Sequence, residues 1–236
     1  MTSDEPTKIA APFPGVVISA GWIILYFVLQ ILATIAAVII FTMAAGGEPA
    51  KLPAISIVWG IIASGVLLLA LLWAYLRIGN RADQLGLMAF GNMSLIKVIG
   101  LAVPLLIGVY AFNALYANFV IPGIDMQKEI TDIIKDIPRT PLNIVLGFTA
   151  IAILAPLVEE LLFRGLLQNA LGHKMPALAA IALSSFVFAL IHLQPYAIPP
   201  LMVLGAAFGY IYHKTGSLQI NILLHAANNA VALLML

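Results

Sequence analysis

Residues 142–171 read LNIVLGFTAIAILAPLVEELLFRGLLQNAL. This run is longer than the about 20 residues that an α-helix needs to cross the hydrocarbon core of a bilayer. It nevertheless holds three charged residues, Glu159, Glu160 and Arg164. A charge at the centre of a spanning helix costs roughly 2.5–3.5 kcal/mol on insertion scales, so we expect these side chains to be paired or functional.

Composition extends this interpretation to the whole chain. Of its 236 residues, 63% are hydrophobic and only 9% are charged, whereas a soluble globular domain has roughly 25% charged residues. We therefore predict an all-α fold, a polytopic transmembrane bundle of about seven or eight helices, for a multi-pass protein of the cell membrane. The expected spans are residues 16–45, 54–77, 95–121, 142–171, 176–193, 196–213 and 217–236.

The polar segments between these spans divide the chain. Residues 1–15 form an N-terminal tail, and residues 16–121 hold the N-terminal transmembrane helices. Residues 122–141 are polar, with apolar residues at near-helical spacing, which predicts either an amphipathic helix at the membrane interface or a solvated loop helix. Lysine and arginine are somewhat more frequent on the side of the N-terminus, which indicates that this end is cytoplasmic.

Charge, cysteine content and missing motifs exclude several functions. The net charge of +1 and the lack of a basic run give no reason to expect a nucleic-acid partner. The absence of cysteine excludes disulfides, thiolate metal sites and a cysteine nucleophile. The chain has no HExxH, no aspartate within an expected span and no GxSxG, so zincins, aspartyl proteases and serine hydrolases are excluded.

Helical geometry separates the two adjacent glutamates. Glu160 and Arg164 are four residues apart and share a face, so we expect them to form an ion pair. Glu159 points about 140° around an ideal helix from Arg164. Pro156 removes a backbone hydrogen bond just before the carboxylates and favours a kink that faces a cavity or another helix. Glu159 is therefore the carboxylate that remains available for another role.

Two later spans each carry a polar stripe. The stripe on span 176–193 comprises Ser184, Ser185, Phe188 and His192. On span 217–236, the stripe comprises Asn221, His225 and Asn229 on one face, with Asn228 beside them. At 1.5 Å per residue, Glu159, His192 and His225 lie at depths of roughly 18, 24 and 17 Å from the same membrane side. The sequence thus predicts that one carboxylate and two imidazoles meet at nearly one level.

Such a set supports two mechanisms of water activation. Glu159 could act as a general base on water with help from His192, while His225 and Asn229 stabilise an oxyanion. Alternatively, Glu159, His192 and His225 could hold a divalent metal such as zinc that activates the water. Spacing does not decide between a metal and no metal.

Each feature alone also has a purely structural explanation. Glu160 and Arg164 could be an ion pair that fixes helix packing, and His192 could cap the end of its helix. His225 and Asn229 could supply interhelical hydrogen bonds, each worth about 0.6 kcal/mol. What favours a reactive site is the convergence of these groups at one depth, because a packing contact needs no second carboxylate.

The ordered motifs resemble those of a known family. Residues E159-E160-x-x-x-R164, F188-x-x-x-H192 and H225-x-x-x-N229 are similar to the three motifs of the CPBP (CAAX protease and bacteriocin-processing, or Abi) intramembrane proteases. That family includes CAAX-prenyl endopeptidases and proteins linked to bacteriocin self-immunity. The resemblance covers about residues 142–236 and implies that they are the catalytic core, in the last four spans.

The resemblance also implies a role for each motif residue. Glu159 and His192 would activate water, His225 and Asn229 would form the oxyanion site, and Glu160, Arg164 and Phe188 would support them. We accordingly expect an intramembrane peptidase whose partners are the lipid bilayer and a peptide or protein substrate. The alternatives are a non-catalytic membrane scaffold or self-immunity protein of the same fold, and a proton-coupled transporter, for which no inverted repeat is evident.

Overall fold

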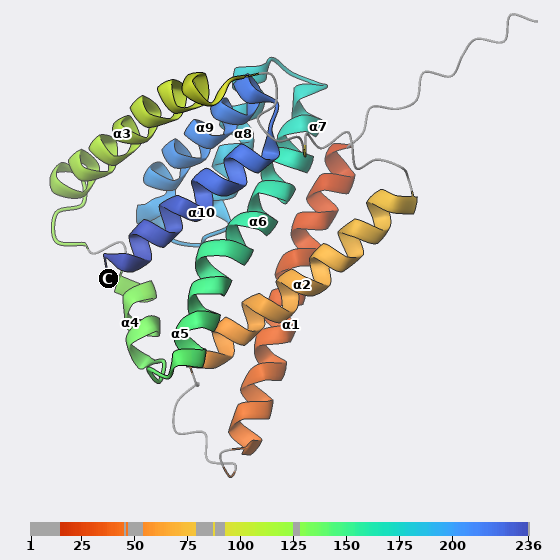
Figure 1. Cartoon of the computed structure of the whole chain (residues 1–236), viewed down its shortest axis with the longest axis vertical. Helices are drawn as coiled ribbons and strands as arrows, with labels where there is room; N and C mark the ends of the chain where they lie inside the picture. The colour runs from red at the N-terminus through yellow and green to blue at the C-terminus, as the bar shows by residue number, and fades with distance from the viewer. Residues whose placement is uncertain are drawn as a thin grey trace, which may run out of the picture.

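The computed structural model describes residues 15–44, 46, 54–78, 87, 93–124 and 128–235. Most of the expected N-terminal tail lies outside this set. All regular secondary structure of the described residues is helical, as composition predicts. Figure 1 shows the helices packed side by side, with the N-terminal pair along one flank and the C-terminal helices in the centre.

The N-terminal part contributes three long helices: α1 (Val16–Ala44), α2 (Ala54–Ile78) and α3 (Leu95–Phe119). Helices α1 and α2 pack against each other, whereas α3 lies apart from them and packs on α9. The approach of α1 to α2 is closest at Gly60, where a Cβ atom would lie 2.1 Å from Thr34 Oγ1. Only glycine fits at this crossing.

The charged span is one continuous helical run in which two π-helical segments interrupt the α-helix. It comprises α5 (Pro141–Phe148), the π-helical segment η2 (Thr149–Leu154), α6 (Ala155–Glu160), the π-helical segment η3 (Leu161–Gln168) and α7 (Asn169–Gly172). Thr140 caps its start by accepting a hydrogen bond from Asn143 N at 3.2 Å. Short π segments are frequent at functional sites, and these two flank Glu159 and Glu160.

Three further helices complete the core: α8 (Ala177–Leu190), α9 (Ile198–Thr215) and α10 (Leu218–Leu234), with a short 3-10 turn, η4 (Pro195–Ala197), before α9. Gly216 ends α9 at φ 65°, a left-handed conformation that suits glycine. Ser217 then caps α10 by accepting from Ile220 N at 3.3 Å. These caps turn the chain so that α10 lies across the charged span (Figure 1).

The structure supports some of the expected membrane spans by length and composition. By length and composition, four helical runs could cross a membrane: α1, α2, α3 and Pro141–Gly172. Helices α8 and α10 are apolar but shorter, and α9 ends in the polar pair His213 and Lys214. The helix limits nevertheless agree closely with those expected, for example 16–44 against 16–45 and 198–215 against 196–213.

The polar segment before the charged span contains a helix, α4 (Lys128–Asp136). Lys128 and Asp132 form an exposed ion pair on it. Just after α4, Ile137 is buried and packs with Val58 of α2 and Ala150 of η2. An amphipathic helix was one of the two expectations for this segment, and part of that segment, residues 125–127, lies outside the described residues.

Candidate active site

The site is organised around Glu160, whose side chain is fully buried at the end of α6. Its Oε1 atom lies 3.0 Å from Arg164 Nη1 and 2.9 Å from His225 Nδ1. Its Oε2 atom accepts a hydrogen bond from Asn221 Nδ2 at 3.2 Å. The carboxylate thus joins the charged span to α10. The expected ion pair between Glu160 and Arg164 is confirmed.

Arg164 extends the same network to α8 and α9. Its side chain is 1% exposed, and its Nη2 donates to the carbonyl of Gly205 at 3.0 Å. The guanidinium lies over the ring of Phe188, 4.9 Å from the centroid, and 5.8 Å from that of Phe208. A buried charge is tolerated only when it is paired and hydrogen-bonded. These contacts satisfy that requirement and fix the positions of four helical segments.

His225 lies between two carboxylates. Its Nδ1 contacts Glu160, and its Nε2 lies 3.7 Å from Glu159 Oε2. The ring stacks on Phe208, with centroids 4.9 Å apart and an interplanar angle of 30°, and Phe188 meets it edge-on at 6.2 Å. Because Glu160 can only accept, Nδ1 carries the proton, and Nε2 is the atom presented to Glu159.

Glu159 differs from its neighbour in exposure. Its side chain is 18% exposed, against 0% for Glu160, so it is accessible from outside the protein. Its 3.7 Å separation from His225 Nε2 exceeds a hydrogen bond and leaves space for a bridging group. Tyr26 of α1, which is 5% exposed, lies within electrostatic range of Glu159.

His192 follows the last turn of α8 and is partly buried. Its Nδ1 lies 2.8 Å from the carbonyl of Phe188, so Nδ1 donates and Nε2 remains an acceptor. The ring packs edge-on against Phe188 at 4.8 Å. In the described contacts, His192 reaches His225 through Phe188 instead of touching it directly. The capping interaction at the end of α8 is present, whereas the position of His192 beside Glu159 and His225 stays a prediction.

Asn229 is attached to the first π segment. Its Nδ2 donates to the carbonyl of Ile151 at 3.1 Å, and its Oδ1 accepts from Asn228 at 3.3 Å. Asn228 in turn accepts from the hydroxyl of Tyr110 on α3 at 2.8 Å. Asn229 lies one turn from His225 on α10, so both face the charged span.

The described residues do not include three His, Asp or Glu side chains placed to hold a metal ion together. The described contacts of His192 are with Phe188. Glu159 and His225 alone would supply two ligands, fewer than the three protein ligands of a catalytic zinc site. The metal set Glu159, His192 and His225 stays a prediction.

Sequence reasoning identified the polar members of this site but missed three participants. The ring of Phe208 and the carbonyl of Gly205 belong to α9, on which no polar stripe was evident. Tyr26 is on α1, where its only signal is the spacing of the buried residues Ser19, Ile23 and Tyr26. Ser184 and Ser185 are buried in α8, and Ser184 bonds the carbonyl of Ile181, so they serve packing.

The similarity to a known family covers the part of the chain that holds the motif residues. Residues 141–231 match the family model described as type II CAAX prenyl endopeptidase Rce1-like. Over these residues the chain is similar to the Rce1-like family. The matched segment begins with the first residue of α5 and ends in α10, so the Rce1-like segment contains every motif residue. Tyr26 and helices α1 to α3 lie outside it.

A curated relative agrees with this assignment. The chain is 27% identical over 119 residues to a Bacillus subtilis (strain 168) protein described as "Putative membrane peptidase YdiL". The alignment covers 50% of this chain and 47% of that protein, so the chain matches about half the length of this relative of the Rce1-like segment. No solved structure matches the chain significantly.

Proposed function

We propose that the chain is an intramembrane endopeptidase that hydrolyses peptide bonds within or at the edge of the bilayer. The observation that carries this proposal is the position of His225 between two carboxylates of different exposure, Glu160 fully buried and Glu159 partly exposed. The similarity of residues 141–231 to the Rce1-like family supports it.

In the proposed reaction, Glu159 takes a proton from water, and the resulting hydroxide attacks the carbonyl carbon of the scissile bond. His192 positions this water through Nε2, since its Nδ1 is engaged by the carbonyl of Phe188. When the tetrahedral intermediate collapses, the C–N bond breaks and the proton on Glu159 passes to the leaving amine. One water is consumed for each bond, and no redox change occurs.

We assign the oxyanion to His225 and Asn229. The Nδ1 proton of His225 points at Glu160, so Nε2 donates to the oxyanion only when the ring carries both protons. Asn229 uses one Nδ2 hydrogen for the carbonyl of Ile151 and retains a second for the oxyanion. Glu160 and Arg164 hold the donors in position without taking part in proton transfer.

The finer architecture is part of this proposal. We propose that all seven predicted helices lie in the membrane, that residues 142–236 form the catalytic core and that the N-terminus is cytoplasmic. The shorter helices α8 and α10 pack on the charged span, which makes full hydrophobic length less necessary for them. The proposed substrate is a peptide or protein in or at the membrane.

The test is cleavage of a fluorogenic peptide library by the purified protein in detergent. Glu159→Gln should lower the rate by about 10²–10⁴-fold, the usual contribution of a general base. Asp136→Asn, an exposed carboxylate on α4, is the matched control and should retain the wild-type rate. Equal cleavage by wild type and Glu159→Gln would contradict the proposal and favour a non-catalytic scaffold or a proton-coupled transporter.

The same assay decides the question of a metal. Wild-type cleavage is measured with and without a chelator, and then with zinc restored. Unchanged activity in chelator supports a glutamate-dependent reaction. Loss that zinc reverses would select the predicted metal site.

A further inference from the structure

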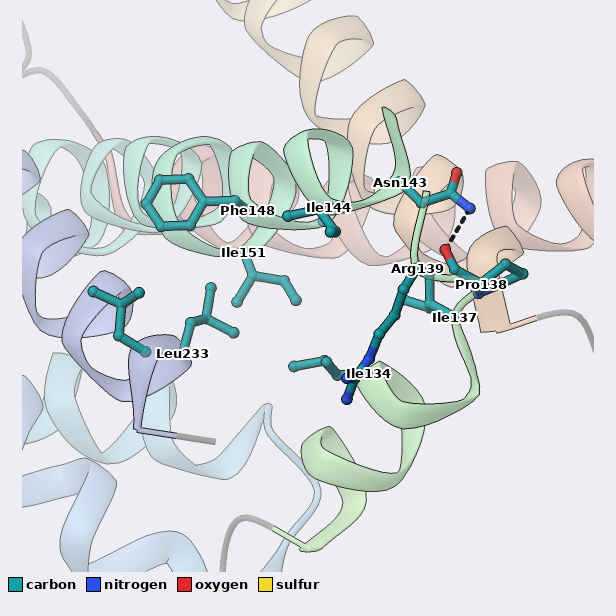
Figure 2. A pocket seen from close by; sticks show the side chains of 11 residues that line it. Ile134, Ile137, Pro138, Arg139, Asn143, Ile144, Phe148, Ile151 and Leu233 are labelled. Carbon is teal, nitrogen blue, oxygen red and sulfur yellow. Dashed lines mark hydrogen bonds between the residues drawn. The ribbon is translucent and has the colours of Figure 1, made fainter. Parts of the chain in front are cut away.

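An apolar cavity of about 380 Å³ lies between α4, α5 and the end of α10 (Figure 2). This volume is within the range of small-molecule sites. Apolar side chains from these helices, from the turn after α4 and from η2 line it, namely Ile134, Ile137, Ile144, Phe148, Ile151 and Leu233. None of the motif residues lines it, so it is separate from the Glu160 network.

The cavity has one polar side. Arg139 lines it, and Figure 2 shows the end of its side chain directed towards Ile134. Arg139 is exposed and forms no ion pair with any other residue that the structure describes. The amide of Asn143, also in the lining, donates to the carbonyl of Pro138 at 2.9 Å and is thereby satisfied. The site thus offers a single cation beside a hydrocarbon surface.

The cavity lies at one end of a membrane-spanning run, where the boundary between lipid headgroups and acyl chains is expected. Asn143 and Ile144 belong to the first turn of the 32-residue run Pro141–Gly172, which is long and apolar enough to span a membrane. Helix α4 directs Ile134 into the cavity, while Lys135 is exposed. An amphipathic helix with its apolar side against hydrocarbon and its charges outward is typical of the interface.

We propose that this cavity binds one acyl chain of an anionic phospholipid whose phosphate pairs with Arg139. A chain with a negative head matches both the apolar lining and a guanidinium that forms no ion pair among the described residues, whereas a zwitterionic lipid would bring its own cation close to Arg139.

The bound lipid would also act on the catalytic site. The side chain of Ile151 lines the cavity, and its carbonyl accepts the hydrogen bond of Asn229. An occupied cavity therefore holds η2 in the position that fixes Asn229. This regulatory part rests on the proposed peptidase function, but the binding part does not.

The first experiment measures binding to the purified full chain. Spin-labelled phosphatidylglycerol and phosphatidylcholine with identical acyl chains are titrated, and the immobilised fraction is followed by electron paramagnetic resonance. Phosphatidylglycerol should bind about fivefold more tightly, the usual effect of one basic residue near an anionic lipid. Arg139→Gln should abolish the preference, and Lys174→Gln, an exposed lysine just beyond α7, should retain it. Equal binding of the two lipids by wild type, or equal losses in both variants, would overturn the proposal.

The second experiment fills the cavity. Gly147 lines it, and no atom lies within 4 Å of a Cβ placed there, so Gly147→Phe adds a ring without a backbone clash. Gly100 on α3 is equally open but outside the lining, which makes Gly100→Phe the control. Native mass spectrometry should show loss of the retained lipid only in Gly147→Phe.

Activity is then compared in phosphatidylglycerol and phosphatidylcholine vesicles. Retained lipid in Gly147→Phe, or displacement of the lipid by a cleavable peptide, would overturn the lipid site. Lipid binding without any peptidase activity would instead refute the proposed function and leave the lipid site intact.

Discussion

The two adjacent carboxylates of the charged span have different surroundings. Glu160 has three partners, from the span itself and from α10, and no exposed surface. Glu159 lies 3.7 Å from His225, beyond hydrogen-bond distance, and is 18% exposed. Adjacent carboxylates on one helix therefore differ in every property that matters for chemistry. Burial with complete pairing holds an arrangement, whereas partial exposure leaves a group able to react.

The largest expected effect is a loss of activity without a loss of stability, and it distinguishes Glu159 from Glu160. Glu159→Gln is expected to lower the cleavage rate by about 10²–10⁴-fold and to change the free energy of unfolding by about 0.5 kcal/mol or less, because Glu159 lies beyond hydrogen-bond distance of His225 and glutamine keeps the size of the side chain. Peptide cleavage and thermal unfolding, measured on one preparation, check both. A large fall in stability would show that Glu159 is structural.

Glu160→Gln should affect stability instead. It leaves Arg164 as a buried charge without a counterion, which typically costs about 3–5 kcal/mol. Chemical unfolding in detergent measures the change. Combining it with Arg164→Met should restore part of the lost stability, because the uncompensated charge is gone. A single variant as stable as wild type would contradict the assigned pairing.

The effect of Asn229→Ala on activity should be smaller than that of Glu159→Gln, and its effect on stability should be smaller than that of Glu160→Gln. Loss of an oxyanion donor lowers kcat by about 10²–10³-fold, with KM little changed. The variant also loses its bond to Ile151, so Asn228→Ala, which removes a neighbouring amide outside the oxyanion site, serves as the control for packing. Equal kcat in the two variants would remove Asn229 from the proposed oxyanion site.

The smallest effect should come from the N-terminal pair of helices. Gly60→Ala places a methyl group 2.1 Å from Thr34 Oγ1, and overpacking of this kind costs about 1–3 kcal/mol. The unfolding midpoint should fall, while kcat per folded molecule stays the same, since neither Gly60 nor Thr34 contacts a residue of the Glu160 network in the described interactions. Thr34→Ala in the same chain should recover stability.

Sequence reasoning predicted local features well. Helix limits follow from apolar runs that end at glycine, proline and charged residues, and Glu160 with Arg164 follows from four-residue spacing. Phe208 and Gly205 could not be predicted as site residues. In an apolar helix, an aromatic residue or a glycine that packs against a neighbour cannot be told by sequence from one that contacts a site. The position of His192 was estimated from depth along straight helices, which says nothing of lateral separation.

The π-helical segments could not be predicted for a different reason. They arise from a shift of backbone hydrogen bonds, and side-chain periodicity over six to eight residues does not report such a shift. The angle of about 140° between Glu159 and Arg164 assumes an ideal α-helix, whereas η3 begins at Leu161, between them. That Glu159 still faces His225 therefore depends on tertiary packing as well as on local spacing.

The segment η2 also sets a rotational phase. Each residue turns an α-helix by about 100°, so the wider turn of η2 determines which way α6 faces relative to α5. Deletion of one residue between Thr149 and Leu154 would remove the residue that the wider turn takes up and restore a plain α-helix. The number of residues in η2 therefore bears on the position of the Ile151 carbonyl, which Asn229 contacts from α10.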